Sequence, residues 1–407
     1  MKSSQAAVLA KSVPVKDRAA QLRALQNAKM ARSAHAYVRG NTVQFYEWLE
    51  ASHGWAIPQG PAVWICGDCH LGNLGPLADS DGRVQVQIRD LDQTVIGNPA
   101  HDLIRLGLSL ATVARGSDLP GITTVRMVEA LMEGYEAAFP ENDEPLPEKP
   151  QVAKLVMKKA MRRTWKHLAR ERIDDTDPVI PLGKRFWPLA RDERKAIDAL
   201  FDMPALGELV TQLSGRADDG RLKVIDAAYW RKGCSSLGRL RYAVLVDVDG
   251  GTVNGHDLCL IDIKEATRAA APHAPGIAMP RHHGRRVVEG ARHLSPALGE
   301  RMRAATLFER PVFIRELLPQ DLKLEIEHVR RGQAIKAARF LAMVVGHAHC
   351  RQMDAAMRRA WRKELQRNRS KTLDAPSWLW SSVLDLLAEH ERGYLDHCRK
   401  YVLQDQR

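Results

Sequence analysis

The chain has 407 residues, of which 45% are hydrophobic and 27% are charged, and this balance excludes a disordered or fibrous protein. Six cysteines are too few for a disulfide framework, and no apolar run is long enough for a signal peptide or a membrane span, so we expect a cytoplasmic protein without a membrane-spanning helix. The net charge of +12 favours anionic partners such as nucleotides, nucleic acids or acidic membrane surfaces, without distinguishing between them.

The first third of the chain is predicted to contain helices and two strands. The second of these strands, at 83–89, alternates apolar and polar residues and leads directly into Asp90. The stretch 140–150 is rich in proline and acidic residues, which is typical of a linker. In chain order, the predicted elements are helices within 17–51, a strand at 62–65, a strand at 83–89, and helices at 103–114 and 123–139.

The pattern changes twice in the rest of the chain. A mainly helical segment is followed, after residue 221, by short apolar strands separated by turns, and helical spacing then returns. The middle segment therefore predicts a small β-rich unit. The elements predicted here are helices within 151–215, strands at 224–227, 242–246 and 258–264, a helix at 285–308, a strand at 312–315 and helices within 331–402.

Polar residues that could bind a metal follow both N-terminal strands. The sequence Gly-Asp-Cys-His-Leu-Gly-Asn at 67–73 follows the first strand, and Asp90 and Asp92 follow the second. Magnesium prefers oxygen ligands and leaves room for substrate phosphates, so Asn73 and Asp90 are candidate Mg²⁺ ligands. Asp68 would then be free to orient a substrate hydroxyl and accept its proton. Asp92 is either a second metal ligand or a solvated turn residue.

Cys66 and Cys69 give the same segment another interpretation, because Cys-Gly-Asp-Cys-His matches the pattern of c-type haem attachment. Such attachment follows export, for which the sequence carries no signal. A structural zinc or a redox-active dithiol is a further alternative, although no second pair of Cys or His residues accompanies this one. We therefore favour two small buried residues on either side of Asp68.

The segment 66–73 resembles the His-Gly-Asp-x-His-x-x-Asn catalytic loop of aminoglycoside phosphotransferases and choline kinases, with Cys66 in place of the usual histidine. The resemblance continues through Asp90. It extends to Gly-Asn-Pro-Ala-His-Asp-Leu at 97–103, which is similar to their Gly-Asp-Pro-x-x-Asp-Leu.

This resemblance implies roles for four residues and a cofactor pair of ATP and Mg²⁺. Asp68 would be the catalytic carboxylate. Asn73 and Asp90 would bind Mg²⁺, and Asp102 would be a buried brace for the catalytic loop.

A phosphotransferase of this kind needs a glycine loop over the nucleotide phosphates and a lysine on a later strand. The segment 232–238 joins two predicted strands, and its small residues could bring backbone amides close to phosphate oxygens. Lys264 lies in an alternating strand that resembles the Val-Ala-Ile-Lys strand of kinases. Glu289, on a predicted helix, is either an ion-pair partner that holds Lys264 toward the phosphates or an exposed glutamate. The candidate loop residues are Gly233, Ser235, Ser236 and Gly238.

These motifs come in an unusual order, because kinases present the nucleotide lobe before the catalytic loop. A circular permutation accounts for the order, since chain ends often lie close together. The predicted fold is α+β: a two-lobed protein-kinase-like fold in circularly permuted order, with a mainly helical large lobe, a small antiparallel β-rich lobe, and Glu316 and Leu317 in the hinge. The predicted divisions are 1–140 with the catalytic loop, 141–220 as linker and helical segment, 221–330 as the small nucleotide-binding lobe, and 331–407 as helices that complete the large lobe.

The whole pattern is similar to an uncharacterised bacterial domain-of-unknown-function family, which implies an architecture but no substrate. We expect an ATP- and Mg²⁺-dependent enzyme that transfers the γ-phosphoryl group to a hydroxyl of a small molecule or protein. AMP transfer by the same fold is one alternative, since a nucleotide bound in the reverse sense would present its α-phosphate. A non-catalytic module that binds nucleotide or nucleic acid is another, favoured by the net charge and by Cys66, although nucleic acid is not the favoured partner.

Overall fold

A computed structural model describes most of the chain. Of the predicted features, Ser235 and nearly all of the linker at 140–150 lie outside the described residues. None of the described helices has the length and apolar character required to cross a membrane. The described ranges are 13–51, 57–117, 119–139, 149–174, 176–211, 222–234, 236–248, 258–324, 331–367 and 375–402.

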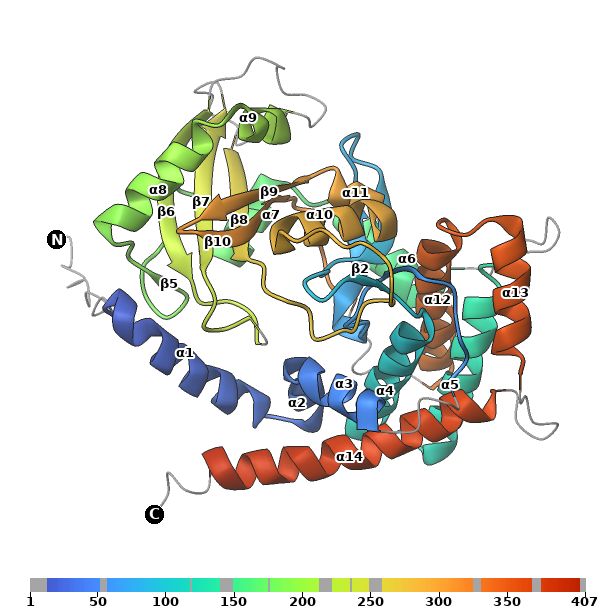
Figure 1. Cartoon of the computed structure of the whole chain (residues 1–407). Coiled ribbons are helices and arrows are strands. Elements are labelled where there is room, and N and C mark those ends of the chain that lie inside the picture. Colours follow the sequence, from blue (N-terminus) through green and yellow to red (C-terminus); the bar gives the residue numbers. More distant parts are fainter. Residues whose placement is uncertain are drawn as a thin grey trace.

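A six-stranded antiparallel sheet organises one part of the molecule (Figure 1). Its strands are β5 (Phe186–Trp187), β6 (Leu222–Trp230), β7 (Arg241–Val248), β8 (Leu258–Glu265), β9 (Met302–Leu307) and β10 (Arg310–Leu317). The strand order is β5-β6-β7-β8-β10-β9, so β8 and β10 are neighbours although other elements separate them in sequence. The loop from β6 to β7 and the end of β10 are therefore fixed by one continuous ladder.

Helices cover both faces of this sheet, which explains why β7 is buried along its whole length. Successive strand residues point to opposite faces. Val246 packs with α8 (Arg191–Phe201) and α9 (Pro204–Thr211) on one face, and its neighbour Leu245 packs with α7 (Trp165–Ile173) on the other. The sheet unit thus begins before residue 221, where the sequence pattern placed its boundary, because β5, α8 and α9 are part of it.

The other part of the molecule is a bundle of helices (Figure 1). Its main helices are α4 (Ala100–Gly116), α5 (Gly121–Glu136), α6 (Gln151–Met161), α12 (Arg331–Cys350), α13 (Ala355–Leu365) and α14 (Ser377–Tyr401). Residues of α4, α5, α12 and α14 share one apolar core. Helices α5 and α12 approach most closely at Gly134, where a Cβ atom would overlap the carbonyl oxygen of Arg339.

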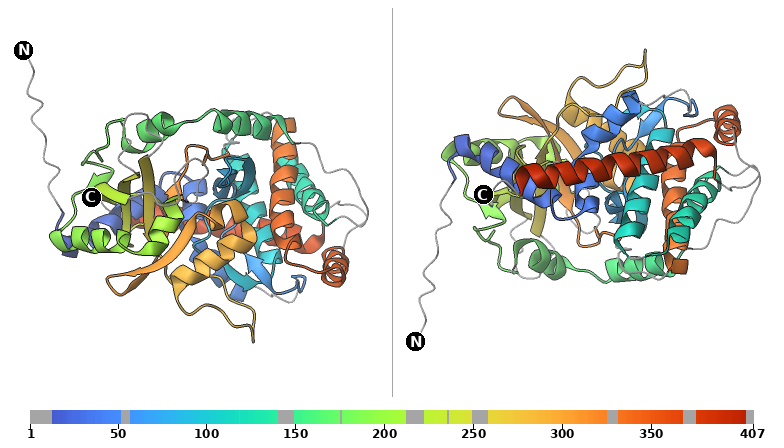
Figure 2. Two further views of the ribbon diagram at one scale, coloured as in Figure 1. Left: turned by 90° about the horizontal axis from the view of Figure 1, so that it is seen from above. Right: turned by 90° about the horizontal axis from the view of Figure 1, so that it is seen from below.

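The N-terminal helices lie beside the C-terminal helix. These are α1 (Val15–Met30), α2 (Ala34–Gly40) and α3 (Thr42–Ala51), and Figure 2 shows α14 running alongside α1 beneath the molecule. His397 Nε2 lies 2.9 Å from the Asn27 carbonyl oxygen. At its other end α1 reaches the sheet unit, where Arg18 and Glu193 form a buried ion pair at 2.7 Å. The two ends of the described chain therefore join both parts of the molecule.

Two short antiparallel ladders carry the polar motifs. Strand β1 (Val63–Ile65) pairs with β4 (Val95–Gly97), and β2 (Leu74–Ala78) pairs with β3 (Val84–Ile88). A single turn of 3₁₀ helix at Leu71–Asn73 joins the first ladder to the second. Each motif thus begins at the end of a short, buried strand.

The predicted class, a mixed α+β fold with antiparallel sheets, is confirmed. The predicted helix at 285–308 is wrong in its second half, because α10 (His283–Leu294) and α11 (Pro296–Gly299) end before strand β9. Residues of β9 pair with β10 in register, and this pairing over-rides their helix-like spacing. The short strands β2, β4 and β5 were not predicted.

Candidate functional site

The loop after β1 is held in place by Asp102, the first-turn acid of α4. Its Oδ2 accepts the Cys66 amide at 2.7 Å and its Oδ1 accepts the Gly67 amide at 2.9 Å. His349 Nε2 lies 3.1 Å from Oδ2, and Tyr135 bonds the other ring nitrogen. Gly67 has a φ of +73°, and a Cβ there would overlap a backbone oxygen. These contacts agree with the bracing position expected for Asp102.

Asp68 is buried at the turn that follows. Arg105 Nε lies 2.9 Å from its Oδ1, and the same guanidinium donates to the Val38 carbonyl oxygen at 2.6 Å. Burial raises the pKa of the Asp68 carboxyl above its usual value, although the charge of Arg105 opposes this shift. One carboxylate oxygen is therefore anchored while the other, Oδ2, is 3.9 Å from His70.

Asn73 and Asp90 meet at the open end of the β2–β3 hairpin. The Arg89 amide donates to the Asn73 carbonyl oxygen at 2.7 Å, so Asp90 lies beside Asn73. The side-chain amide nitrogen of Asn73 donates to the Asp68 carbonyl oxygen at 3.0 Å, which leaves its Oδ1 as the atom available to a metal. The hairpin thus brings together the Asn73 side chain and Asp90, the first acid after β3.

Lys264 reaches this pair from the sheet unit. Its Nζ forms an ion pair with Asp92 and lies 3.5 Å from Asp90 Oδ1. The Lys264 side chain is 4% exposed, whereas Asp90 is 45% exposed and so is accessible to a metal ion. Burial and the charge of Asp90 raise the pKa of Asp92 to about 6. The pKa of Asp90 is lowered instead, because the charges of Lys264 and Arg315 outweigh the effect of burial, which would raise it.

Of the two alternatives for Glu289, the ion pair with Lys264 is not formed. Glu289 lies on α10, is partly exposed and pairs with Arg292 one turn later at 2.9 Å. Instead, Arg286 of the same helix is buried and donates to backbone oxygens of Asp92, Thr94 and Thr267. Helix α10 therefore contacts the segment after Asp90 through an arginine and not through a glutamate.

The predicted glycine loop joins β6 and β7. Gly233 and Gly238 have φ values of +97° and +96°, which favour glycine. Ser236 is buried, and a Cβ on Gly233 would overlap its hydroxyl. Lys29 of α1 donates to the Gly233 carbonyl oxygen at 3.0 Å, so this loop also touches the N-terminal helices.

Glu316 and Leu317 end strand β10 and are both buried. The Glu316 carbonyl oxygen accepts from Arg301 at 2.9 Å, and Arg301 also pairs with Asp321 at 3.0 Å. Leu317 packs in the apolar cluster that contains α7. This segment is rigidly held, and it borders a cavity of only about 20 Å³, which has room for about one water molecule.

Four cations line this small cavity. They are Arg89, Arg172, Lys232 and Arg315, and Asp321 is the one acid in the lining of the cavity. On the sheet, Arg315 and Arg241 both pair with the buried Asp262, at 3.2 and 2.6 Å. The space next to the predicted hinge is therefore cationic.

The two neighbouring thiols lie in surroundings that do not favour a metal ion. Sulfur atoms of Cys66 and Cys69 and a carboxylate oxygen of Asp102 lie within 4.8 Å of one another. A hydrogen bond to Cys69 and burial raise the pKa of the Cys66 thiol, which disfavours the thiolate that a metal requires. Asp102 is already bonded to two backbone amides. Both cysteines are fully buried, as expected for small packing residues.

A protein-family model described as "Uncharacterized protein conserved in bacteria (DUF2252)" matches residues 18–400, which is almost the whole chain. The chain belongs to this family. No curated protein and no solved structure matches it. The family description names no activity. Any statement about the chemistry of this DUF2252 member therefore rests on the geometry of its site.

Several residues that shape the site of this DUF2252 member were not predicted. Arg105 could have been found, because it follows Asp102 by three positions and so lies on the same helix face. Asp262 could have been found as well, since it precedes Lys264 by two positions on a strand and shares its face. Nothing in the local sequence of Arg286 indicates its contact with the segment after Asp90.

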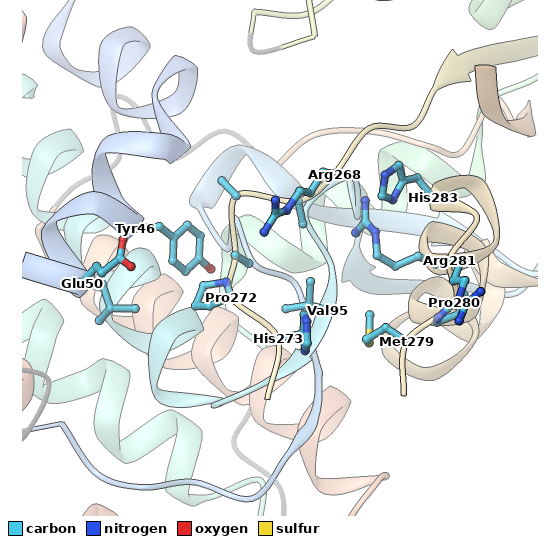
Figure 3. Close-up of a pocket in the computed structure, with 15 residues that line it drawn as sticks. Tyr46, Glu50, Val95, Arg268, Pro272, His273, Met279, Pro280, Arg281 and His283 are labelled. Atoms are coloured by element: carbon cyan, nitrogen blue, oxygen red, sulfur yellow. The ribbon is translucent and has the colours of Figure 1, made fainter. Parts of the chain in front are cut away.

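Two larger cavities adjoin the site, on either side of the segment 268–270. One has a volume of about 640 Å³. Figure 3 shows Tyr46 and Glu50 on one wall of it, and Arg281 and His283 on the opposite wall. The other, of about 680 Å³, lies between the glycine loop and the terminal helices.

Proposed function

We propose that the chain is an ATP- and Mg²⁺-dependent phosphotransferase with a protein-kinase-like fold in circularly permuted order. The observation that carries this proposal is the meeting of Lys264 from the sheet unit with Asp90 and Asp92 beside Asn73. In kinases a strand lysine contacts the nucleotide phosphates, and an Asp and an Asn bind the magnesium ions that lie between the phosphates and the protein. The same set of groups is assembled here from distant parts of the chain.

The order of elements supports the fold assignment. A glycine loop joins the first two strands of β6, β7 and β8, the lysine lies on the third, and helix α10 follows. Kinases present these parts in the same order. Helices α12 and α14, which come last, pack with α4 and α5, so the C-terminal helices complete the bundle that carries the catalytic loop.

The residues divide the reaction between them. Asn73 and Asp90, with Asp92 beside them, would hold Mg²⁺, which would neutralise charge on the phosphates. The acceptor hydroxyl oxygen bonds to the γ-phosphorus as the bond from that phosphorus to the bridging oxygen breaks. ADP leaves with the electron pair of this bond, and the hydroxyl proton passes to Asp68.

Titration calorimetry with a non-hydrolysable ATP analogue tests this proposal directly. We expect binding that requires Mg²⁺ and that weakens at least about tenfold in Asp90→Ala, since a ligand of the ion is lost. Asp81→Ala is the matched control, because Asp81 lies on the same hairpin and its carboxylate pairs with the exposed Arg83. Undiminished Mg²⁺-dependent binding by Asp90→Ala would contradict the metal assignment. Binding of the analogue by a protein that consumes no ATP itself would indicate a non-catalytic module.

A second candidate activity, AMP transfer, is favoured by the cations near the predicted hinge. An adenine ring prefers an apolar slot, whereas Arg89, Arg172, Lys232 and Arg315 favour phosphates there. A nucleotide bound in this reversed sense would present its α-phosphate. Transfer of label from α-labelled ATP with release of pyrophosphate would support this activity, and transfer from γ-labelled ATP would support the first.

A further inference from the structure

A groove of about 680 Å³ opens where the terminal helices meet the glycine loop. Its volume is within the range of small-molecule sites. Residues of α1, the α2–α3 turn and α14 form its floor and sides, and Leu237, Gly238 and Arg239 of the glycine loop form its roof. Figure 2 shows α1 and α14 side by side beneath this part of the molecule.

This groove adjoins the catalytic residues. Thr42, at the start of α3, lines it. Gln93, which follows Asp92 directly, also lines it, and the Gln93 carbonyl oxygen lies against Gly67, the residue before Asp68. A molecule in the groove would therefore sit between the glycine loop and the catalytic carboxylate, which is the place for an acceptor hydroxyl.

The charges of the groove have one sign. Arg23, Arg239 and Arg268 line it, and no aspartate or glutamate does. No ion pair joins these three arginines to a carboxylate within the described ranges of the chain. Their charges are therefore available to a ligand, and a cationic ligand would meet three like charges without compensation.

We propose that the groove binds the acceptor, and that this acceptor is a small hydroxyl compound carrying an anionic group, either a phosphate or a carboxylate. This inference rests on the proposed phosphotransferase function and names its substrate class. It separates the chain from aminoglycoside and choline phosphotransferases, whose acceptors are cations. The acceptor hydroxyl faces Asp68, and its anionic group lies among Arg23, Arg239 and Arg268.

Three hexoses that differ in charge test this inference by calorimetry on the full chain. The probes are glucose 6-phosphate, glucose and glucosamine, each titrated with and without the Mg²⁺–ATP analogue. We expect glucose 6-phosphate to bind at least about tenfold more tightly than the other two, because only it offers an anion to the arginines.

Two variants locate the binding. Arg23→Gln combined with Arg268→Gln should weaken glucose 6-phosphate about fivefold or more and leave affinity for the ATP analogue unchanged. Arg281→Gln is the control, because Arg281 lines only the neighbouring cavity and should change neither affinity. Three results would overturn the inference. Glucosamine could bind as tightly as glucose 6-phosphate, or the double variant could bind glucose 6-phosphate as tightly as the native protein. The third result is no binding of glucose 6-phosphate by a protein that binds nucleotide. Anion binding without nucleotide binding would instead contradict the phosphotransferase function and leave the charge preference of the groove standing.

Discussion

Lys264 lies between Asp90 and Asp92, so the groups that it contacts would change if Mg²⁺ and nucleotide bound there. It compensates Asp92 and, at 3.5 Å, Asp90. A magnesium ion at these carboxylates would compete with the lysine for the same oxygens, which would release Lys264 toward the phosphates. Lys264 therefore holds together the two acids that the proposed function assigns to Mg²⁺.

Replacing this lysine should change the affinities for metal and nucleotide in opposite directions. In Lys264→Met, Mg²⁺ binding without nucleotide should become about tenfold tighter, because a competing cation has been removed. Binding of the ATP analogue should weaken about tenfold, because a charged contact to phosphate is lost. Calorimetric titrations measure both. Lys223→Met, at an exposed position of β6, is the control, and a parallel loss of both affinities would mean that Lys264 is only structural.

At the scale of elements, the helical bundle depends on a close crossing of α5 and α12. Gly134 has no room for a Cβ, because the backbone of Arg339 occupies that space. From the other helix, Gly346 packs against Tyr135 and Ala138 in the same way. Tyr135 is also bonded to His349, which contacts Asp102. The crossing therefore positions the brace of the catalytic loop.

Gly134→Ala should destabilise the protein by about 2–3 kcal/mol, since the two backbones must separate to admit one methyl group. Urea denaturation measures the change in the free energy of unfolding. Gly121→Ala, at the start of the same helix, is a matched control because its Cβ would meet nothing within 4 Å. That control should be neutral or slightly stabilising. Equal stability of the two variants would show that the helices separate without cost.

The features that the sequence predicts best are those that neighbouring residues determine. Asp68, Asn73 and Asp90 lie at strand ends with recognisable turns, so their convergence follows from short-range pattern and resemblance. The partners of these groups come from elsewhere: Arg286 reaches Asp92 from a helix that is far away in sequence. Strand β9 was mistaken for helix because only its pairing with β10 defines it. Tertiary contacts of this kind leave no local signal.

At the scale of the whole molecule, buried neutral histidines link stability to pH. Burial, with a smaller contribution from Arg105, lowers the pKa of His390 to about 3, and burial lowers that of His101 to about 4. In the unfolded chain both would titrate near pH 6.5. Below that pH the unfolded state binds more protons than the folded state. Stability is therefore greatest above about pH 6.5 and declines as the pH falls toward these lowered values.

His390→Asn should reduce this acid sensitivity. Asparagine keeps a donor for the Leu386 carbonyl oxygen, which the His390 ring nitrogen contacts at 3.0 Å, but it cannot take up a proton. Between pH 7 and pH 4.5 the native protein should lose roughly 3 kcal/mol more stability than the variant. Urea unfolding at a series of pH values measures this difference. Parallel loss of stability in both proteins would assign the acid sensitivity to other groups.

The packing of α14 against the N-terminal helices also determines when the site can form during synthesis. The loop at 66–73 and α4 leave the ribosome before α12 and α14, and the apolar surface that they share with those helices remains uncovered until the helices have been made. The whole sheet unit, with Lys264, is synthesised in between and can fold around its own apolar clusters. The loop at 66–73 is therefore translated before the helices that cover it and reaches its folded geometry only after them.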